Sequence, residues 1–464
     1  MMRKRMAHAM IGHEVKVGVP VIKVLSRKYM VKKFVREGTE MEIVISSRDR
    51  EILRELAKKQ LELANAEINQ RRKKLWYKHN ALQGEVPLVH LDAWGLYHEL
   101  VDPKLKCEGE FARLVEREIY KNFINQDWFD DDRVTPDKFG WNYDTGFKPF
   151  DMDLKQEFIT GKKENEDSGL GMHFIPVLED LEEEFDDLKP STFWVDEETS
   201  QKKVQTIQEA FGDILPVYMK MDCLYAVPTQ QIVHLMGMEN MMLNLAQCPD
   251  KYKEMMDRLA DDFVAYYRML EEKRMILPTA EYEWVGQATF AYTDELPNSR
   301  EVDGRPLTTK DVWGFMDSQE TLCISPKMFE ELIFPCYEKI GKQFGILSYG
   351  CCEPVNRVWE SCVSKFDNLR KVSISPWADE DYMGEVLRGS RVIYHRKPSP
   401  NYLGVGDALD EEAVRKHIRK SLVAARGCKM EITQRDVYTL NHDPGKGRRF
   451  VELIREEIEN NWKA

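Results

Sequence analysis

The sequence predicts a (β/α)8 barrel. Short apolar runs alternate with helical segments along most of the 464 residues, and several runs are near-continuously apolar, as strands buried on both faces are. Their spacing fits βα units and not hairpins, and about eight such strands close a barrel. The predicted strands are residues 86–91, 174–178, 214–219, 275–277, 345–349, 372–375, 391–395 and 429–433.

Helical periodicity and composition complete the predicted organisation. A cap-like Ser46 opens a long amphipathic helix that runs to about Trp76, and further helices are predicted at residues 249–274 and 326–344. We expect a basic N-terminal extension at residues 1–45 and the barrel at residues 46–464. A stretch rich in charged residues and glycine, residues 136–171, predicts an insertion near the barrel mouth.

Charge and cysteine content exclude several classes of protein. The net charge of -13 argues against a nucleic-acid or anionic-membrane surface, so a small molecule or a protein partner is favoured. Nine scattered cysteines do not form a disulfide framework, and no apolar run reaches the ~18 residues of a membrane span. We therefore expect a cytoplasmic protein. The acidic runs at residues 127–132 and 179–187 are expected to be solvated.

The strongest candidate site is Cys351, Cys352 and Glu353, directly after the predicted strand at residues 345–349. The active site of a (β/α)8 barrel lies at the carboxyl ends of its strands, so these residues are expected at the mouth. Thiolates and carboxylates bind zinc, and a catalytic zinc keeps three protein ligands and one open position. The alternative is a buried turn with unligated thiols, of which a vicinal disulfide is a variant.

Other residues are weaker candidates for the same site. Asp436 follows the last predicted strand and is the preferred further ligand, with His395 and Asp222 behind it; Cys428 precedes that strand and is excluded. Two pairs are expected near strand ends as pocket acids, bases or clamps: His90 with Asp92, and Asp294 with Glu295. Four tryptophans form either an aromatic wall or core: Trp94, Trp284, Trp313 and Trp377.

No phosphate-binding glycine loop, His-Glu-x-x-His or Gly-x-Ser-x-Gly motif occurs, so phosphoryl transfer, zincin proteolysis and α/β-hydrolase chemistry are unsupported.

Several motifs point to a known family. They are Ile324, Ser325, Pro326, Phe329 and Pro335; the stretch 372–379; Lys397, Pro398 and Pro400; Gly427, Cys428, Glu431, Asp436, Thr439, Asp443 and Pro444; and Gly237, Met238, Glu239 and Pro249. With them, the chain from about Arg48 to Trp462 resembles the uroporphyrinogen decarboxylase superfamily, and most closely its corrinoid-dependent methyltransferase branch. The resemblance implies a (β/α)8 barrel and, by analogy, a homodimer.

Two departures from the family pattern affect the function that the resemblance implies. The arginine-rich signature with which the decarboxylase binds porphyrin carboxylates is replaced by residues 75–80, Leu-Trp-Tyr-Lys-His-Asn, which demotes decarboxylation. The His-x-Cys pair that holds zinc in the methyltransferase branch is replaced by residues 348–352, Ser-Tyr-Gly-Cys-Cys, so the family's ligand set is not intact.

The resemblance implies a methyltransferase that removes a methyl group from a small methylated donor and passes it to cobalamin carried by a corrinoid protein. The donor is an aryl methyl ether, a methylated amine or a methylated thiol. Either zinc, held by Cys351, Cys352 and Glu353 with Asp436 or His395 assisting, or a positioned acid neutralises the leaving heteroatom. The alternatives are a decarboxylase-like lyase and a non-catalytic barrel subunit of a methyltransferase complex.

Overall fold

The computed structural model describes residues 41–158, 172–281 and 284–462. Contacts divide the chain into two units, residues 1–40 with 156–173 and residues 41–155 with 174–464. Nearly all of the predicted basic extension, and residues 159–171 of the predicted insertion, lie outside the described residues. The central sheet and its helices belong to the second, larger unit, whereas residues 156–158 and 172–173 of two short strands belong to the first.

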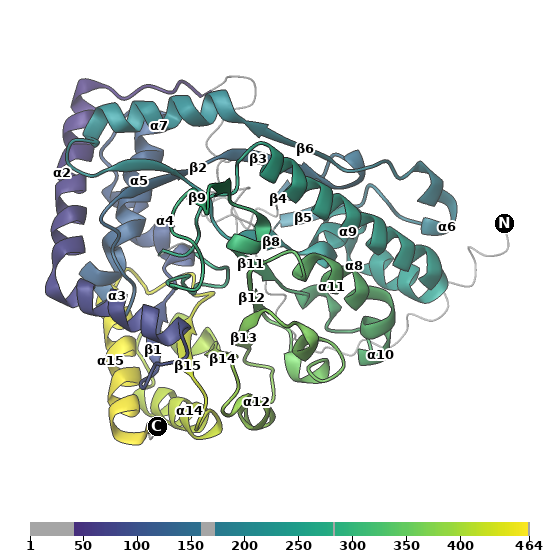
Figure 1. The fold of residues 1–464 in the computed structure, drawn as a ribbon. Coiled ribbons are helices and arrows are strands. Elements are labelled where there is room, and N and C mark those ends of the chain that lie inside the picture. Colours follow the sequence, from purple (N-terminus) through teal and green to yellow (C-terminus); the bar gives the residue numbers. More distant parts are fainter. Residues whose placement is uncertain (1–40, 159–171, 282–283, 463–464) are drawn as a thin grey trace. The chain divides into compact units, whose positions relative to one another are not determined.

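A seven-stranded parallel sheet forms the centre of this unit, in a mixed α/β fold (Figure 1). Its order is β1-β15-β14-β13-β12-β11-β8. The strands are β1 (Leu88–Leu91), β8 (Leu224–Ala226), β11 (Trp313–Met316), β12 (Ile346–Tyr349), β13 (Leu369–Ile374), β14 (Ile393–Arg396) and β15 (Met430–Gln434). Five of the predicted strands are confirmed, namely β1, β12, β13, β14 and β15. Every carboxyl end lies at the same edge, because all neighbours are parallel.

Helices follow the strands in the expected alternation. They are α8 (Pro228–Gln247), α9 (Pro249–Glu272), α10 (Pro326–Met328), α11 (Phe334–Gly341), α12 (Glu380–Leu387), α13 (Asn401–Gly404), α14 (Glu411–Ala424) and α15 (Pro444–Asn461). Aspartates cap the amino ends of α12, α14 and α15, and their side chains accept backbone N–H groups left free in the first turn. These helices bury their apolar faces in one large core with the sheet, including Met256, Tyr337 and Ile454.

The predicted helix from Ser46 to Trp76 is two helices, α2 (Ser47–Asn65) and α3 (Glu67–Asn80). Ser46 caps α2 as expected, since its side chain accepts from Asp49 N. The backbone becomes extended at Ala66, and the Ala64 carbonyl accepts the side-chain amide of Asn69 at 2.9 Å. That side-chain bond satisfies a carbonyl that the break between the helices leaves free. The apolar periodicity therefore spans two helices and not one.

A second apolar cluster joins α2 to α5 (Glu110–Ile124) and α7 (Glu197–Phe211), and includes Leu53, Phe111 and Phe211. Short helices α4 (Tyr97–Leu100) and α6 (Leu181–Glu184) lie in the connections.

Three predicted strands are not part of the central sheet. Residues 214–219 overlap β7 (Val217–Lys220), which pairs with β2 (Phe139–Asn142), and residues 174–178 overlap β5 (Met172–Ile175), which pairs with β4 (Lys155–Phe158). Residues 275–277 form no strand. Two further pairs are β3 (Asp144–Lys148) with β6 (Thr192–Asp196), and β9 (Glu301–Val302) with β10 (Arg305–Pro306). Much of the predicted insertion is thus strand.

The acidic runs differ in their environment. Residues 179–187 are mostly exposed, as predicted, apart from the buried Leu181 and Phe185. Asp131 in the other run is fully buried, which corrects the prediction of a solvated segment. Its carboxylate accepts from Leu91 N and contacts His90 Nδ1, each at 2.8 Å, and it thereby joins the loop to β1.

A hairpin, residues 284–290, lies between the edge strands β8 and β1. Cys223, just before β8, donates its backbone N–H to Trp284 O at 3.5 Å, and the His90 ring of β1 packs edge-on against Phe290. An isolated antiparallel bridge joins Trp284 and Phe290. The hairpin therefore lies in the gap between β8 and β1, the two edge strands, which do not pair with each other. No closed sheet is present in the described ranges.

Candidate active site at the carboxyl edge of the central sheet

Buried polar side chains follow five strands at the edge where the parallel strands end. Asp92 follows β1, Asp317 follows β11, Ser375 follows β13, Lys397 follows β14 and Arg435 follows β15. In open α/β sheets and in barrels alike, ligands bind outside the carboxyl ends of parallel strands. This carboxyl edge is the candidate active site.

The turn after β12 brings Cys351 and Cys352 to this edge, as predicted. Gly350 begins it at φ 97°, a left-handed conformation suited to glycine, and donates its N–H to Met316 O at 2.8 Å. The two sulfurs are 3.5 Å apart, with Cys351 fully buried and Cys352 half-buried. Burial raises the pKa of the Cys351 thiol, whereas a hydrogen bond from Cys351 lowers the pKa of the Cys352 thiol. Cys352 is thus the more reactive thiol.

Glu353 holds the cysteine turn in place. One carboxylate oxygen accepts from Cys351 N at 2.8 Å, and the other accepts from Ser318 N at 2.9 Å. The side chain is buried and joins the loop after β12 to the loop after β11. Each oxygen of this carboxylate is therefore hydrogen-bonded by a backbone donor.

Two neighbouring acids lie in the loop after β11. Asp317 is fully buried, and neither of its carboxyl oxygens has a hydrogen-bond partner. Burial raises its pKa well above the usual range, and the charges of Glu353 and Glu320 raise it further, so this site favours the protonated acid. Burial also raises the pKa of Glu320 to about 7, although Glu320 accepts a hydrogen bond from Thr229 Oγ1 at 2.9 Å.

Two cations face the thiols from β14 and β15. Lys397 Nζ donates to Gln287 Oε1 at 2.8 Å and lies 3.4 Å from Cys351 O. The Arg435 guanidinium donates to the same Gln287 oxygen. Gln287 is the tip of the hairpin at residues 284–290, so this hairpin reaches the carboxyl edge.

Solvent reaches the edge beside Tyr225 of β8, whose side chain is 41% exposed. Its ring stacks on Phe315 of β11 at 4.8 Å between centroids, and Asp317, Cys351 and Arg435 are electrostatic neighbours of its hydroxyl. An exposed aromatic ring therefore lies beside the buried charged groups of this edge.

Zinc does not fit the residues predicted to hold it. Both oxygens of Glu353 are occupied by backbone N–H groups, and Lys397 and Arg435 direct positive charge at the cysteines. No group of three His, Cys, Asp or Glu side chains in the described part of the chain is arranged to hold a metal ion. The thiols are therefore better suited to act without a metal.

His395 belongs to a different cluster, in the sheet interior. With Lys371 of β13, Glu431 of β15 and His79 of α3 it forms a fully buried network around the Glu431 carboxylate. Lys371 Nζ and His79 Nε2 lie 3.1 and 3.0 Å from Glu431 Oε2, and His395 Nδ1 lies 3.5 Å from Oε1. Burial lowers the pKa of His395 well below its usual range, so the ring is neutral.

The other predicted site residues fall at both edges of the sheet. Asp436 is at the carboxyl edge, 3.7 Å from Arg435 Nε and an electrostatic neighbour of Cys352. Glu295 forms two bonds of 2.6 and 2.7 Å with Arg370 at the amino end of β13, and the adjacent Asp294 is exposed. The structure does not bring Asp294 and Glu295 to the cysteines.

Asp222 and Cys428 also lie at the amino edge. Asp222 precedes β8 and bonds Lys220 Nζ at 3.1 Å. Cys428 precedes β15 and donates to Gly384 O at 3.4 Å. Asp92 is close to Arg435, at 3.6 Å, whereas its predicted companion His90 is held by Asp131.

The four tryptophans do not form one wall. Trp313 is buried in the core, Trp284 packs near His90, Trp94 lies against Tyr438, and Trp377 after β13 is half-exposed.

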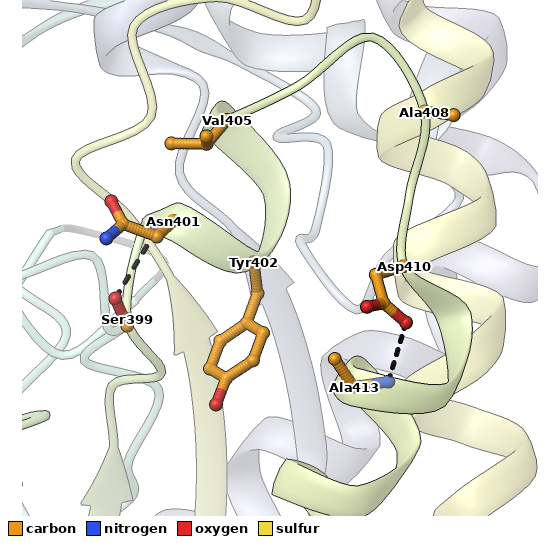
Figure 2. Close-up of a pocket in the computed structure, with 7 residues that line it drawn as sticks. All are labelled: Ser399, Asn401, Tyr402, Val405, Ala408, Asp410 and Ala413. Carbon is orange, nitrogen blue, oxygen red and sulfur yellow. Dashed lines mark hydrogen bonds between the residues drawn. The ribbon is translucent and has the colours of Figure 1, made fainter.

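A shallow hollow of about 380 Å³ lies beyond β14 (Figure 2). It is lined by Ser399, Asn401, Tyr402, Val405, Ala408, Asp410 and Ala413. Asp410 is occupied in capping α14 through Ala413 N at 3.0 Å, and Tyr402 stacks on His417. The hollow carries no free charged group among these residues, so it is peripheral to the candidate site.

Sequence reasoning missed Asp317, Lys397, Arg435 and Gln287 as site residues. One available signal was a charged residue placed directly after an apolar run, which applies to Asp317 after residues 313–316. Gln287 had no comparable signal, because its partners lie 110 and 148 residues away along the chain.

No family model matches the sequence, and no curated protein matches it. Among solved structures, the chain is similar to a methyltransferase from Methanosarcina mazei, with a TM-score of 0.47 and 11% sequence identity over 84% of this chain and 98% of that chain. Within the described residues, no helix is long and apolar enough to cross a membrane.

Proposed function

We propose that the protein is a methyltransferase that removes a methyl group from a small methylated donor and passes it to a corrinoid protein. The donor class is an aryl methyl ether, a methylated amine or a methylated thiol. The observation that carries the proposal is Asp317, a buried acid with a raised pKa and no hydrogen-bond partner among the described residues, at the carboxyl edge beside the two cysteines.

Cleavage of a methyl–heteroatom bond leaves an electron pair on oxygen, nitrogen or sulfur, and this developing charge is the main barrier. Asp317 is placed to hydrogen-bond the heteroatom through its carboxyl proton and to transfer that proton as the bond breaks. The leaving heteroatom keeps the electron pair of the broken bond and is protonated by Asp317. Asp317 is left as a carboxylate beside Lys397.

The reduced corrinoid of the partner supplies the nucleophile that accepts the methyl group. Lys397 and Arg435 stabilise the negative charge that passes to Asp317, since both are electrostatic neighbours of the thiols and acids at this edge. Tyr225 offers an exposed aromatic face for the donor at this edge. No step is assigned to zinc.

The direct test is methyl transfer to cob(I)alamin, followed by absorbance, with a panel of methyl ethers, methylamines and methylthiols. We expect Asp317→Asn to lower the rate by about 10²- to 10⁴-fold, the usual contribution of a general acid. Asp222→Asn is the matched control at the amino edge and is expected to keep the wild-type rate. Transfer by Asp317→Asn at the wild-type rate, or none by the wild type with any donor, contradicts the proposal.

A lyase acting on a carboxylate is the second candidate, and the Lys397 and Arg435 pair favours it, because buried cations recognise carboxylates. Release of carbon dioxide from a carboxylic acid, without methyl transfer, would identify this activity. If the protein shows neither activity but binds a methyltransferase partner tightly, it is a non-catalytic subunit.

The proposal includes the predicted (β/α)8 barrel. The hairpin at residues 284–290 contacts both β1 and the segment before β8, the two edges that a barrel brings together. In this arrangement, the hairpin takes the place of a paired strand.

A further inference from the structure

The Lys397 side chain is a buried cation without an ionic partner. It is 4% exposed, and no carboxylate of the described residues lies within 4 Å of its Nζ. Its two hydrogen-bond acceptors are neutral, Gln287 Oε1 and Cys351 O. Burial lowers the Lys397 pKa, and the side chains of Cys351, Cys352 and Asp436 oppose that shift without forming an ion pair with it. Buried charges in proteins are normally paired, so this ammonium group is poised for an anion.

Arg435 is also buried, but unlike Lys397 it has two acidic neighbours, Asp92 and Asp436. It is 8% exposed, and its Nε has no hydrogen-bond partner. Asp92 and Asp436 are 3.6 and 3.7 Å from that nitrogen, beyond hydrogen-bond distance, so they offset its charge without satisfying its N–H group. The hydrogen bond that its guanidinium does make, to Gln287 Oε1, is shared with Lys397.

The hairpin that carries Gln287 is strained at its tip. Gly286, Gln287 and Ala288 have φ angles of 71°, 49° and 61°, three left-handed residues in succession, of which two are not glycine. Such conformations are unfavourable for residues with a Cβ and are concentrated at functional sites. The base of the hairpin is held separately, because Lys371 Nζ bonds Thr289 Oγ1 at 2.7 Å and Asn80 Nδ2 bonds Phe290 O at 3.0 Å.

We propose that Lys397 and Arg435 form a carboxylate-binding subsite, and that the Gln287 amide oxygen occupies the place of a ligand carboxylate oxygen. A carboxylate offers two charged oxygens to the two cations, whereas the amide offers one neutral oxygen. The strained tip, residues 286–288, can move away from the two cations while the base of the hairpin, Thr289 and Phe290, keeps its hydrogen bonds. The exposed Tyr225 ring, an electrostatic neighbour of Arg435, adds an aromatic surface, so the ligand is a small aromatic carboxylate.

This inference rests on the proposed function in one respect: the methyl donor of that reaction is the carboxylate ligand. Carboxylate binding itself requires neither a corrinoid nor turnover, so it is measured on the full chain alone.

The test is calorimetric titration with benzoate, and with benzamide as the uncharged analogue. We expect benzoate to bind at least tenfold more tightly than benzamide, and Lys397→Met to remove that preference. Lys429→Met is the matched control, because Lys429 lies just before β15 at the amino edge and bonds Gly84 O. It should bind benzoate as the wild type does.

Variants of Gln287 give a second test that does not require loss of a cation. Gln287→Glu places a tethered carboxylate between the cations, and we expect a higher melting temperature and no benzoate binding. Gln287→Ala empties the position, and we expect tighter benzoate binding. Equal binding of benzoate and benzamide, no binding of either below 10 mM by the wild type or Gln287→Ala, or benzoate binding by Gln287→Glu at wild-type affinity overturns the subsite.

Turnover separates this inference from the proposed function. If 4-methoxybenzoate binds through Lys397 but no donor of the panel yields methyl transfer, the methyltransferase proposal fails and the subsite stands. If methoxybenzene, which has no carboxylate, is demethylated with the same kcat/KM as 4-methoxybenzoate, the subsite is overturned as a donor site and the methyltransferase proposal stands.

Discussion

Lys371 and Lys397 are buried lysines on adjacent strands, yet their surroundings differ. Lys371 Nζ lies 3.1 Å from Glu431 and also bonds Thr289 Oγ1 and Phe290 O, so its charge and donors are satisfied. Lys397 at the carboxyl edge has only neutral acceptors. The difference separates a cation that holds the fold together from a cation kept available for a ligand.

The largest loss of stability is expected when the buried network around Glu431 is disrupted. Lys371→Met leaves Glu431 buried without its ammonium partner, and we expect a loss of about 3–5 kcal/mol in the free energy of unfolding, measured by urea denaturation. Lys397→Met removes no ion pair, and a change within about 1 kcal/mol is expected. Equal losses in the two variants would contradict the assignment of different roles.

The next effect concerns the clamp on the cysteine turn. Glu353→Gln replaces one acceptor oxygen by an NH₂ group, so either Cys351 N or Ser318 N loses its partner. We expect a destabilisation of about 1–3 kcal/mol in urea denaturation. Glu360→Gln, which alters an exposed glutamate nearby in the chain, is the control and should leave stability unchanged.

A pH dependence distinguishes Asp317 from the paired carboxylates. Its folded pKa is raised above the unfolded value, near the ordinary 3.8, so wild-type stability falls as the pH rises from about 4 towards the folded pKa. Asp317→Asn lacks this term. We expect its stability relative to wild type to increase with pH in that window, by at most about 1.4 kcal/mol per pH unit. A flat difference between pH 4 and 8 would mean that Asp317 is not buried as an acid.

The smallest effect is in thiol chemistry. The Cys352 pKa is lowered and those of Cys351 and Cys428 are raised, so Cys352 should react with iodoacetamide at pH 7 before Cys351 and Cys428. Peptide mass spectrometry after a short exposure measures the order. Faster labelling of buried Cys428 would contradict it.

Much of the fold was predictable where strands were long enough and apolar enough to stand out. The strands from β12 to β15, and β1, each overlap a predicted run, although β13, β14 and β15 also contain charged residues. The strands β8 and β11 were missed, since one has three residues with an exposed Tyr225 and the other contains Gly314. Their membership depends on pairing with each other, which local pattern does not encode.

The candidate site was predictable in place but not in composition. The position of Cys351 and Cys352 followed from the strand before them. The groups around the cysteines depend on the tertiary fold. Glu353 accepts a hydrogen bond from Ser318 N, and Lys397 donates one to Gln287. The prediction of zinc ligands therefore rested on residue type alone, because the sequence does not reveal the hydrogen bonds that Glu353 accepts.

The hairpin in the gap between β8 and β1 has a mechanical consequence. The other neighbours in the sheet are joined by ladders of backbone hydrogen bonds, which fix their spacing to within a fraction of an ångström. At the gap, the contacts are mainly rings and side chains, including His90 with Phe290. Side-chain packing tolerates changes in spacing that a ladder of backbone hydrogen bonds does not, so β8 and β1 are held less rigidly to each other than the paired strands are.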